Sequence, residues 1–153
     1  MEFKDIPWSD VVVNAKGFTV FKDKYPVTEG HLLFVPKEQD WQHLTKCFEA
    51  AYKWGYDWVE RGYCDSFNIG QNVGAEAGQT VMYPHVHLIP RRKGDMEDPR
   101  GGVRHVIPEK GNYRKALDKE INGKYTIEEI VDATNKILEN TWQKPKYTLY
   151  YKV

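Results

Sequence analysis

Cysteine is scarce in this chain, long apolar runs are absent, and neither sign of charge is in excess. The two cysteines, Cys47 and Cys64, are too widely spaced for a zinc knuckle and too few to cross-link a secreted domain. No apolar run reaches the length of about 18 residues that a membrane-spanning helix needs. Residues 1–10 lack the basic start and apolar stretch of an export signal. We therefore expect a reduced, cytoplasmic protein that does not associate with membranes.

The balance of charge limits the partners of the whole molecule. Lysine plus arginine equals aspartate plus glutamate, at 22 each. No overall field therefore draws the protein to a nucleic-acid backbone, and no stable nucleic-acid complex is expected. With 153 residues and 41% hydrophobic content, the chain has the size of one domain that buries about two thirds of its unfolded surface. We treat residues 1–153 as a single domain in which any anion site is local.

Short β-rich runs separated by turn-like segments predict an antiparallel sheet, and two longer segments predict helices. Asp40 can cap a helix that runs to about Arg61, and Thr126 with Glu129 forms a capping box for a second helix that ends near Asn140. The fold class is therefore α+β, with a five- or six-stranded antiparallel sheet and two main helices. The expected strands are Val11–Val13, Gly17–Phe21, His31–Val35, Ser66–Asn72, a run within 79–92 and Tyr147–Val153.

The helix over 40–61 carries more aromatic side chains than one face can bury. Tyr52, Trp54 and Tyr56 remain outside its core-facing stripe, and an aromatic excess of this kind is typical of protein interfaces. We therefore predict a homodimer that pairs through this helix. The core-facing stripe consists of Leu44, Phe48, Ala51, Trp58 and Val59.

The stretch over 79–92 is the most informative part of the sequence. If it is a strand, His85 and His87 project from one face together with Val81 and Tyr83, because side chains alternate along a strand. Pro84 removes a backbone donor beside His85, so the strand there either lies at an edge or is irregular. The opposite, apolar face would comprise Met82, Pro84, Val86 and Leu88.

Two histidines two positions apart have three physical interpretations. They can be neutral core side chains bonded to backbone carbonyls, they can bind a metal such as Zn²⁺, or they can act as nucleophile and acid–base group. A metal needs further ligands, and the remaining histidines, His31, His43 and His105, are distant in sequence. The sequence around His85 and His87 favours the third interpretation.

Basic residues follow the paired histidines. Arg91, Arg92 and Lys93 come directly after the expected strand, and residues 91–114 as a whole predict a basic surface loop. Small residues over 73–78 allow backbone N–H groups to approach a ligand. Together these features predict a pocket for a phosphate chain, in which phosphoryl or nucleotidyl transfer is the expected chemistry.

The segment from Gln79 to Pro90 resembles the signature of the histidine triad (HIT) superfamily, with histidines alternating with hydrophobic residues. The resemblance covers about residues 5–93. Residues 98–104 and 107–110 resemble an extension found in bacterial-type HIT hydrolases related to the diadenosine polyphosphate hydrolase branch. Matching residues elsewhere in the chain are Ile6, Pro7, Asp23, Pro26, Gly30 to Leu33, Val35, Pro36, Asn72 and Gly74.

The resemblance implies roles for individual residues. His85 matches the histidine that attacks the α-phosphorus, and His87 matches the one that bonds the phosphate or the leaving group. Asp23 matches the ribose-binding position. The remaining implied nucleotide contacts are Asn72, Gln79 and Thr80 near the phosphates, with Phe21 and Leu33 as walls of the base pocket.

Tyr83 replaces the first histidine of the triad. A phenol cannot titrate near neutral pH as an imidazole does, so we expect retained activity with a changed pH dependence. His31 matches a family histidine that approaches the triad, and we expect it to bond Tyr83 and to share its role.

The resemblance implies a hydrolase that cleaves a nucleoside 5′-phosphate derivative, a dinucleoside polyphosphate in particular, through a nucleotidyl-histidine intermediate. The alternatives are a nucleoside phosphoramidase, a nucleotidyl transferase, a non-catalytic nucleotide-binding protein and a metalloprotein that uses His85 and His87. No metal site and no tightly bound cofactor are expected, although Mg²⁺ can accompany the substrate.

Overall fold

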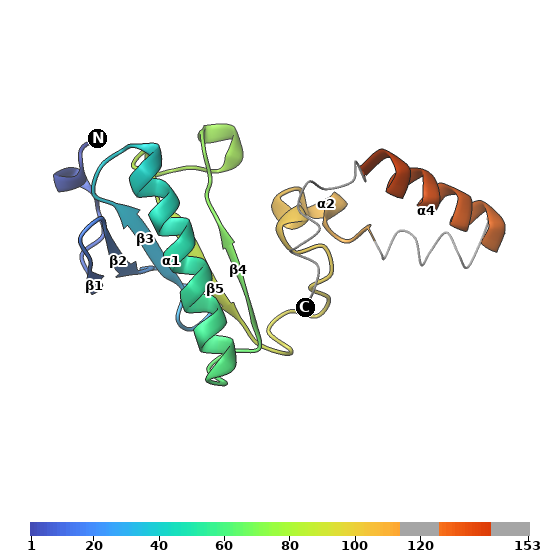
Figure 1. The fold of residues 1–153 in the computed structure, drawn as a ribbon, viewed down its shortest axis with the longest axis horizontal. Helices are drawn as coiled ribbons and strands as arrows, with labels where there is room; N and C mark the ends of the chain where they lie inside the picture. Colours follow the sequence, from blue (N-terminus) through green and yellow to red (C-terminus); the bar gives the residue numbers. More distant parts are fainter. Residues whose placement is uncertain (114–125, 142–153) are drawn as a thin grey trace.

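The computed structural model describes residues 1–113 and 126–141, which form a five-stranded sheet and the helices around it (Figure 1). The strands follow the order β1-β2-β3-β5-β4, and every neighbouring pair is antiparallel. The α+β prediction and the five-stranded option are confirmed, and the strand proposed for 147–153 lies outside the described residues. The strands are β1 (Val11–Asn14), β2 (Phe18–Lys22), β3 (Leu32–Pro36), β4 (Ser66–Gly70) and β5 (Val86–Arg91).

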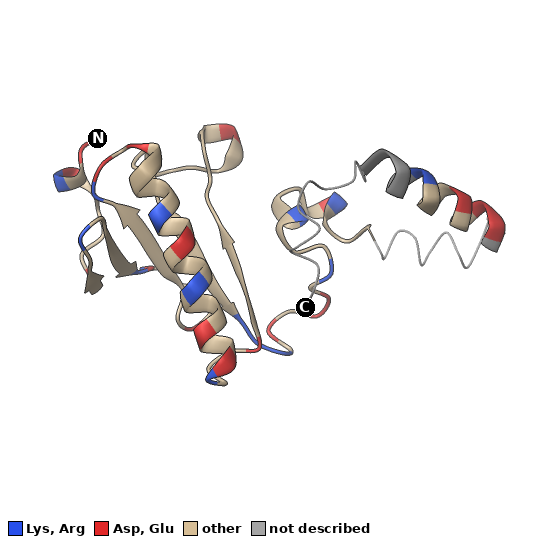
Figure 2. Cartoon of the chain, viewed as in Figure 1, with Lys and Arg blue, Asp and Glu red and all other residues tan. Residues whose placement is uncertain are grey.

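Helix α1 spans Trp41–Glu60 and begins where the sequence predicts. The Asp40 carboxylate accepts a 2.8 Å hydrogen bond from the backbone N–H of His43, which satisfies one of the free donors in the first turn. The helix lies across one face of the sheet (Figure 1), and its outward face carries charged residues of both signs (Figure 2). It therefore buries one stripe against the strands and exposes the other.

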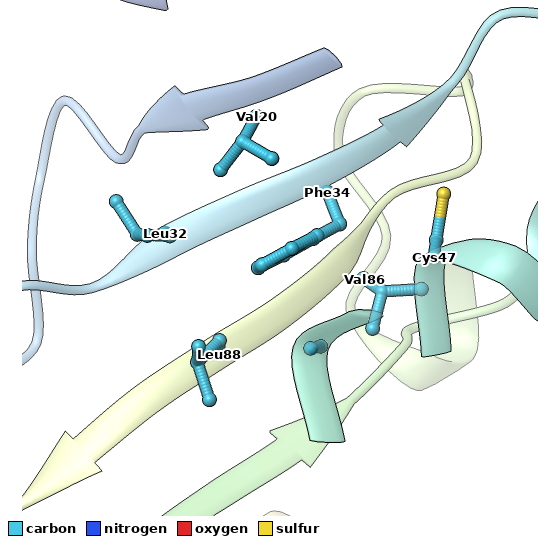
Figure 3. Close-up of a cluster of buried hydrophobic side chains, with 7 residues drawn as sticks. Val20, Leu32, Phe34, Cys47, Val86 and Leu88 are labelled. Carbon is cyan, nitrogen blue, oxygen red and sulfur yellow. The ribbon is translucent and has the colours of Figure 1, made fainter. Parts of the chain in front are cut away.

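The main core fills the space between α1 and the sheet. Its fully buried members come from three central strands and the helix (Figure 3), and Trp54 packs on it with its ring at 80° to Phe34 and 5.2 Å away. The prediction that Trp54 lies on a dimer surface is therefore wrong, whereas Tyr52 and Tyr56 are each 51% exposed. The buried cluster comprises Val20, Leu32, Phe34, Cys47, Ala51, Val86 and Leu88.

Gly55 sets how closely α1 approaches the sheet. A Cβ at this position would lie 2.6 Å from the ring of Phe67 in β4, well inside contact distance. A glycine there costs helix propensity but lets the Phe67 ring reach the helix backbone. The same ring also contacts the rings of Tyr52 and Tyr56.

The N-terminal segment covers part of the opposite face of the sheet. It begins with the short 3-10 helix η1 (Phe3–Asp5), and Phe3, Ile6 and Trp8 pack on that face. The buried residues beneath them are Phe21, Leu33, Val35 and Tyr83. This second apolar cluster adjoins the histidines.

The segment after β5 contains short helices where the sequence predicts only a loop. The 3-10 helix η3 (Gly102–Val106) packs against α2 (Pro108–Gly111). Gly101 has φ +101°, and a Cβ on it would overlap the carbonyl of Gly111, so the segment folds on itself at a point that only glycine fits. For the described residues 91–113, the prediction of a loop without packed elements is therefore wrong.

The last described helix, α4 (Ile127–Thr141), begins at the predicted capping residue, where the Thr126 hydroxyl accepts from the backbone N–H of Glu129 at 3.2 Å. It lies away from the sheet (Figure 1). Within residues 1–113 and 126–141, no helix combines the length and the apolar character needed to cross a membrane.

Candidate active site

Strand β5 is shorter than predicted and does not include both histidines. β5 begins at Val86, and the residues before it bend out of the extended conformation, so only His87 of the pair lies within the strand. Pro84 lacks the backbone N–H that would extend the ladder, and the irregularity expected at that proline is confirmed. Val86 and Leu88 face the core as predicted, but Met82 is 53% exposed and does not belong to the apolar face.

His85 is held in one orientation by the backbone. Its Nδ1 lies 2.8 Å from the carbonyl oxygen of Tyr83, which can only accept, so Nδ1 carries the proton of the neutral ring. The lone pair is therefore on Nε2. The ring is only 8% exposed, and the indole of Trp8 lies against it with the ring centroids 4.7 Å apart. Sequence reasoning missed Trp8, because an isolated aromatic before a first strand carries no distinctive signal.

Three side chains meet beside His85 at the end of the central strands. His31 Nε2 lies 2.9 Å from His87 Nδ1 and 3.5 Å from Asp23 Oδ2. Strand pairing explains the meeting, because the backbone N–H of Asp23 bonds to the His31 carbonyl and β5 pairs with β3. The rings of His85 and His87 have their centroids 5.1 Å apart. The structure thus places four of the predicted site residues in one group.

A backbone donor fixes the proton positions in this group. The N–H of Val27 donates to His31 Nδ1 at 3.1 Å, so the proton of a neutral His31 sits on Nε2. That Nε2–H donates to His87 Nδ1, which places the His87 proton on its own Nε2. His85 and His87 therefore offer opposite functions at Nε2, a lone pair on His85 and a donor on His87.

Burial keeps the rings of His31 and His87 neutral. It lowers the pKa of His87 to about 4, with further lowering from the neighbouring His85 and His31 that outweighs the opposing effect of Asp23. Burial also lowers the pKa of His31, although the Asp23 carboxylate acts in the opposite direction. At neutral pH, His87 is thus a hydrogen-bond donor that carries no positive charge.

Tyr83 points away from the other site residues. Its hydroxyl donates to the carbonyl of Pro36 at 2.6 Å, and its ring packs edge-on to Phe3. The expectation that His31 bonds Tyr83 is wrong, because His31 bonds Val27, His87 and Asp23 instead. Tyr83 contributes its backbone carbonyl, which orients His85.

The remaining residues predicted to contact the nucleotide differ in how deeply they are buried. The Gln79 side chain accepts from the N–H of Gly74 at 2.9 Å and donates to the Val81 carbonyl at 3.0 Å, so it braces the loop before β5. Thr80 is exposed and Asn72 is half-buried. Phe21 and Leu33 are buried in the second apolar cluster, with the Trp8 ring 6.2 Å from that of Phe21.

The basic residues after β5 are largely committed to their own segment. Arg91 makes two hydrogen bonds to Asp95, at 2.8 and 2.9 Å, and Arg100 pairs with Asp98. Arg92 bonds the carbonyl of Glu29 and is stacked on a tyrosine ring. Figure 2 shows basic and acidic residues interspersed in this part of the chain. The interpretation of this segment as a cluster of cations for a phosphate chain is not supported.

Asp23, His31 and His87 offer ligand atoms within 4.8 Å of one another, the spacing of a possible metal site. A histidine that binds a metal usually donates its other ring N–H to a neighbour. His31 instead accepts at Nδ1 from Val27, which leaves a proton on the Nε2 that would face the metal. The hydrogen bonds therefore favour a group of side chains joined by hydrogen bonds over a metal centre. The absence of a metal stays a prediction.

The structure is that of an α+β protein in which an antiparallel sheet carries a helix on one face and histidines gather at the central strands. Residues 6–94, more than half of the chain, match the HIT domain. The chain belongs to the HIT family, as its resemblance to the signature predicts.

Two curated relatives are similar over the same part of the chain. The bis(5'-nucleosyl)-tetraphosphatase [asymmetrical] of Schizosaccharomyces pombe is 34% identical over 98 residues, covering 59% of this chain and 53% of that protein. The bis(5'-adenosyl)-triphosphatase of Saccharomyces cerevisiae is 30% identical over 112 residues, covering 59% of this chain and 50% of that protein. The chain spans about half the length of these relatives.

Solved structures show the same fold. A Zn-bound histidine triad family protein from Mycobacterium smegmatis aligns with a TM-score of 0.54 and 27% identity, over 62% of this chain and 73% of that one. A Hit-like protein involved in cell-cycle regulation from Bartonella henselae aligns with a TM-score of 0.51 and 28% identity, over 60% of this chain and 74% of that one.

Proposed function

We propose that this protein hydrolyses a dinucleoside polyphosphate through a nucleotidyl-histidine intermediate on His85. The observation that carries the proposal is the hydrogen bond from His85 Nδ1 to the Tyr83 carbonyl, which leaves the Nε2 lone pair available for attack. The names of the two curated relatives support the substrate class.

The proposed reaction has two displacements. In the first, His85 Nε2 forms a bond to the α-phosphorus, and the bond from that phosphorus to the bridging oxygen breaks. The leaving phosphate departs as an anion, so His87 Nε2–H needs only to donate a hydrogen bond to it. In the second, water attacks the same phosphorus, the N–P bond breaks, and the electron pair returns to Nε2. The proton of the water is released to solvent.

Asp23 and His31 act on this reaction by positioning. His31 fixes the proton of His87 on Nε2, and Val27 fixes His31 in turn. Asp23 keeps carboxylate lone pairs for ribose hydroxyls, although Oδ1 already accepts from the N–H of Tyr25. The proposed remaining contacts are Asn72, Gln79 and Thr80 along the phosphates, with Phe21 and Leu33 beneath the base.

Substitution of His85 by asparagine tests the proposal. His85→Asn should abolish turnover while changing AMP affinity by less than about tenfold, because the lost interaction belongs to the transition state. The assay measures products from an asymmetric dinucleoside polyphosphate in ¹⁸O-water, and the label should appear on the nucleoside monophosphate released from His85. Unchanged turnover in the variant would remove His85 from the nucleophile role.

A panel of substrates and acceptors distinguishes the alternatives. Faster cleavage of a nucleoside phosphoramidate would indicate a phosphoramidase, and transfer to an acceptor other than water would indicate a transferase. Binding of AMP without turnover of any substrate would indicate a nucleotide-binding protein.

We also propose a homodimer and a cytoplasmic location. Tyr52 and Tyr56 are half-exposed on α1, next to the edge strand β4. Within the described residues β4 lies at the edge of the sheet, and an aromatic patch beside an edge strand suits association with a second copy. Sedimentation of the wild type and of Tyr56→Glu tests this surface, and a monomer in both would contradict it. No metal is proposed to be held by protein ligands, with Mg²⁺ arriving on the substrate.

A further inference from the structure

A cavity of about 760 Å³ lies between the sheet and the segment that follows it. Its floor includes Asn68 of β4 and Ile89 of β5, and Val103 and Val106 of η3 line the other side. This volume lies within the range of about 300–1,000 Å³ that is usual for small-molecule sites.

The cavity lies on the His87 side of the proposed reaction centre. His87 and His31 belong to its lining. His87 holds the donor proposed for the leaving group, and its ring centroid lies 5.1 Å from that of His85. A phosphate chain that starts at His85 and passes His87 therefore leads into this cavity.

The walls suit a nucleoside better than a phosphate chain. Val103 and Val106 are 66% and 76% exposed, so they present apolar surface to any occupant. The charges of Arg91 and Asp95 neutralise each other through their paired hydrogen bonds. The cavity thus has apolar contacts for a flat ring and little net charge to attract phosphate.

Asn68 supplies a polar group for the edge of a base. Its Oδ1 accepts from Arg91 at 2.8 Å, which orients the amide and leaves the Nδ2 hydrogens toward the η3 side. A Cβ on Gly102 would lie 3.7 Å from this Nδ2. An amide donor of this kind can bond a ring nitrogen or carbonyl of a base.

The η3 side of the cavity is fixed by contacts within its own segment. Gly111 carries no Cβ because one would overlap the ring of His105, and His105 Nε2 donates to the Arg100 carbonyl at 2.9 Å. Arg104 bonds the carbonyl of Lys110 at 3.0 Å. These contacts hold Val103 and Val106 in place before any ligand binds.

We propose that this cavity binds the nucleoside of the leaving nucleotide, so that the site recognises both ends of a dinucleoside polyphosphate. The inference rests on the proposed function and deepens it. It assigns to Val103, Val106, Ile89 and Asn68 the selection of substrates that carry a second base.

A substitution that fills the cavity tests the inference. Val103→Trp places a large ring in the site, and the exposed position tolerates it. Ile107→Trp is the matched control, because Ile107 is 53% exposed on the same segment but does not line the cavity. Both changes are made in the His85→Asn protein, and calorimetry measures the Kd of diadenosine tetraphosphate and of AMP.

We expect a loss of affinity that is selective for diadenosine tetraphosphate over AMP. Val103→Trp should raise the ratio of the Kd of diadenosine tetraphosphate to that of AMP at least about tenfold, and Ile107→Trp should leave the ratio unchanged. An unchanged ratio in Val103→Trp, or an equal rise in Ile107→Trp, overturns the inference. Neither result affects the proposed function, which fails separately if the wild type does not turn over diadenosine tetraphosphate.

Discussion

Acidification should destabilise this fold through His87. The pKa of His87 is about 4 in the folded protein and about 6.5 in an unfolded chain. Above pH 6.5 the ring is neutral in both states and contributes no pH dependence. Between pH 6.5 and 4 the unfolded chain takes up a proton that the folded protein does not, so the free energy of unfolding falls. Below about pH 4 both states are protonated and the loss is complete.

The magnitude follows from the difference between the two pKa values. That difference corresponds to about 3 kcal/mol at 1.36 kcal/mol per unit. The His87 ring is partly exposed, so solvent screening reduces the expected loss to about 2 kcal/mol. His31 shares the direction of the shift, so removal of His87 alone leaves some acid sensitivity.

Urea unfolding of the wild type and of His87→Gln at pH 7, 5.5 and 4 measures this effect. The variant should lose about 2 kcal/mol less than the wild type across this range, a midpoint difference of about 1 M urea. The control is His105→Gln, which also removes one histidine but leaves the hydrogen bond between His31 and His87 in place. Equal pH dependence of the wild type and His87→Gln would refute the reasoning.

Three further substitutions test individual contacts by urea unfolding. Tyr83→Phe should cost about 1–2 kcal/mol, because the buried carbonyl of Pro36 loses its donor, while kcat stays within about twofold; a tenfold loss of kcat at full stability would show that the hydroxyl serves catalysis. Asp40→Ala should cost about 1 kcal/mol through loss of the α1 cap, and Asp40→Asn should restore most of it; an equal loss in both would contradict the cap. Gly55→Ala should cost about 1–3 kcal/mol because its Cβ meets the Phe67 ring, and a more stable variant would show that the ring moves freely.

Local signals in the sequence were sufficient for α1. A capping Asp40 and an apolar stripe of helical period are both read within one segment, and the structure begins the helix where they predict. Alternation was a weaker guide at β5, because it describes any extended chain. Pro84 lacks the donor that would extend β5 toward Met82, so the strand begins only at Val86 and the face assigned to Met82 was wrong.

The site required long-range contacts that no local pattern contains. His31 and His87 are 56 positions apart, and their bond depends on the pairing of β3 with β5. The Val27 donor is a backbone group, so residue identity carries no signal for it. The resemblance to the HIT signature supplied His85, His87 and Asp23 but misplaced the Tyr83 hydroxyl, because the Tyr83 ring packs in the second apolar cluster and its hydroxyl bonds the Pro36 carbonyl.

The central claim is that His85 carries the nucleotide during turnover. Rapid-quench mass spectrometry, with an alkaline quench that preserves a phosphoramidate, measures this directly on the wild type mixed with excess diadenosine tetraphosphate. The peptide that contains His85 should gain the mass of an adenylyl group within the first turnover, and the same peptide of His85→Asn should not. Product formation in the wild type without any adduct on that peptide, at every quench time and at saturating substrate, would contradict the account.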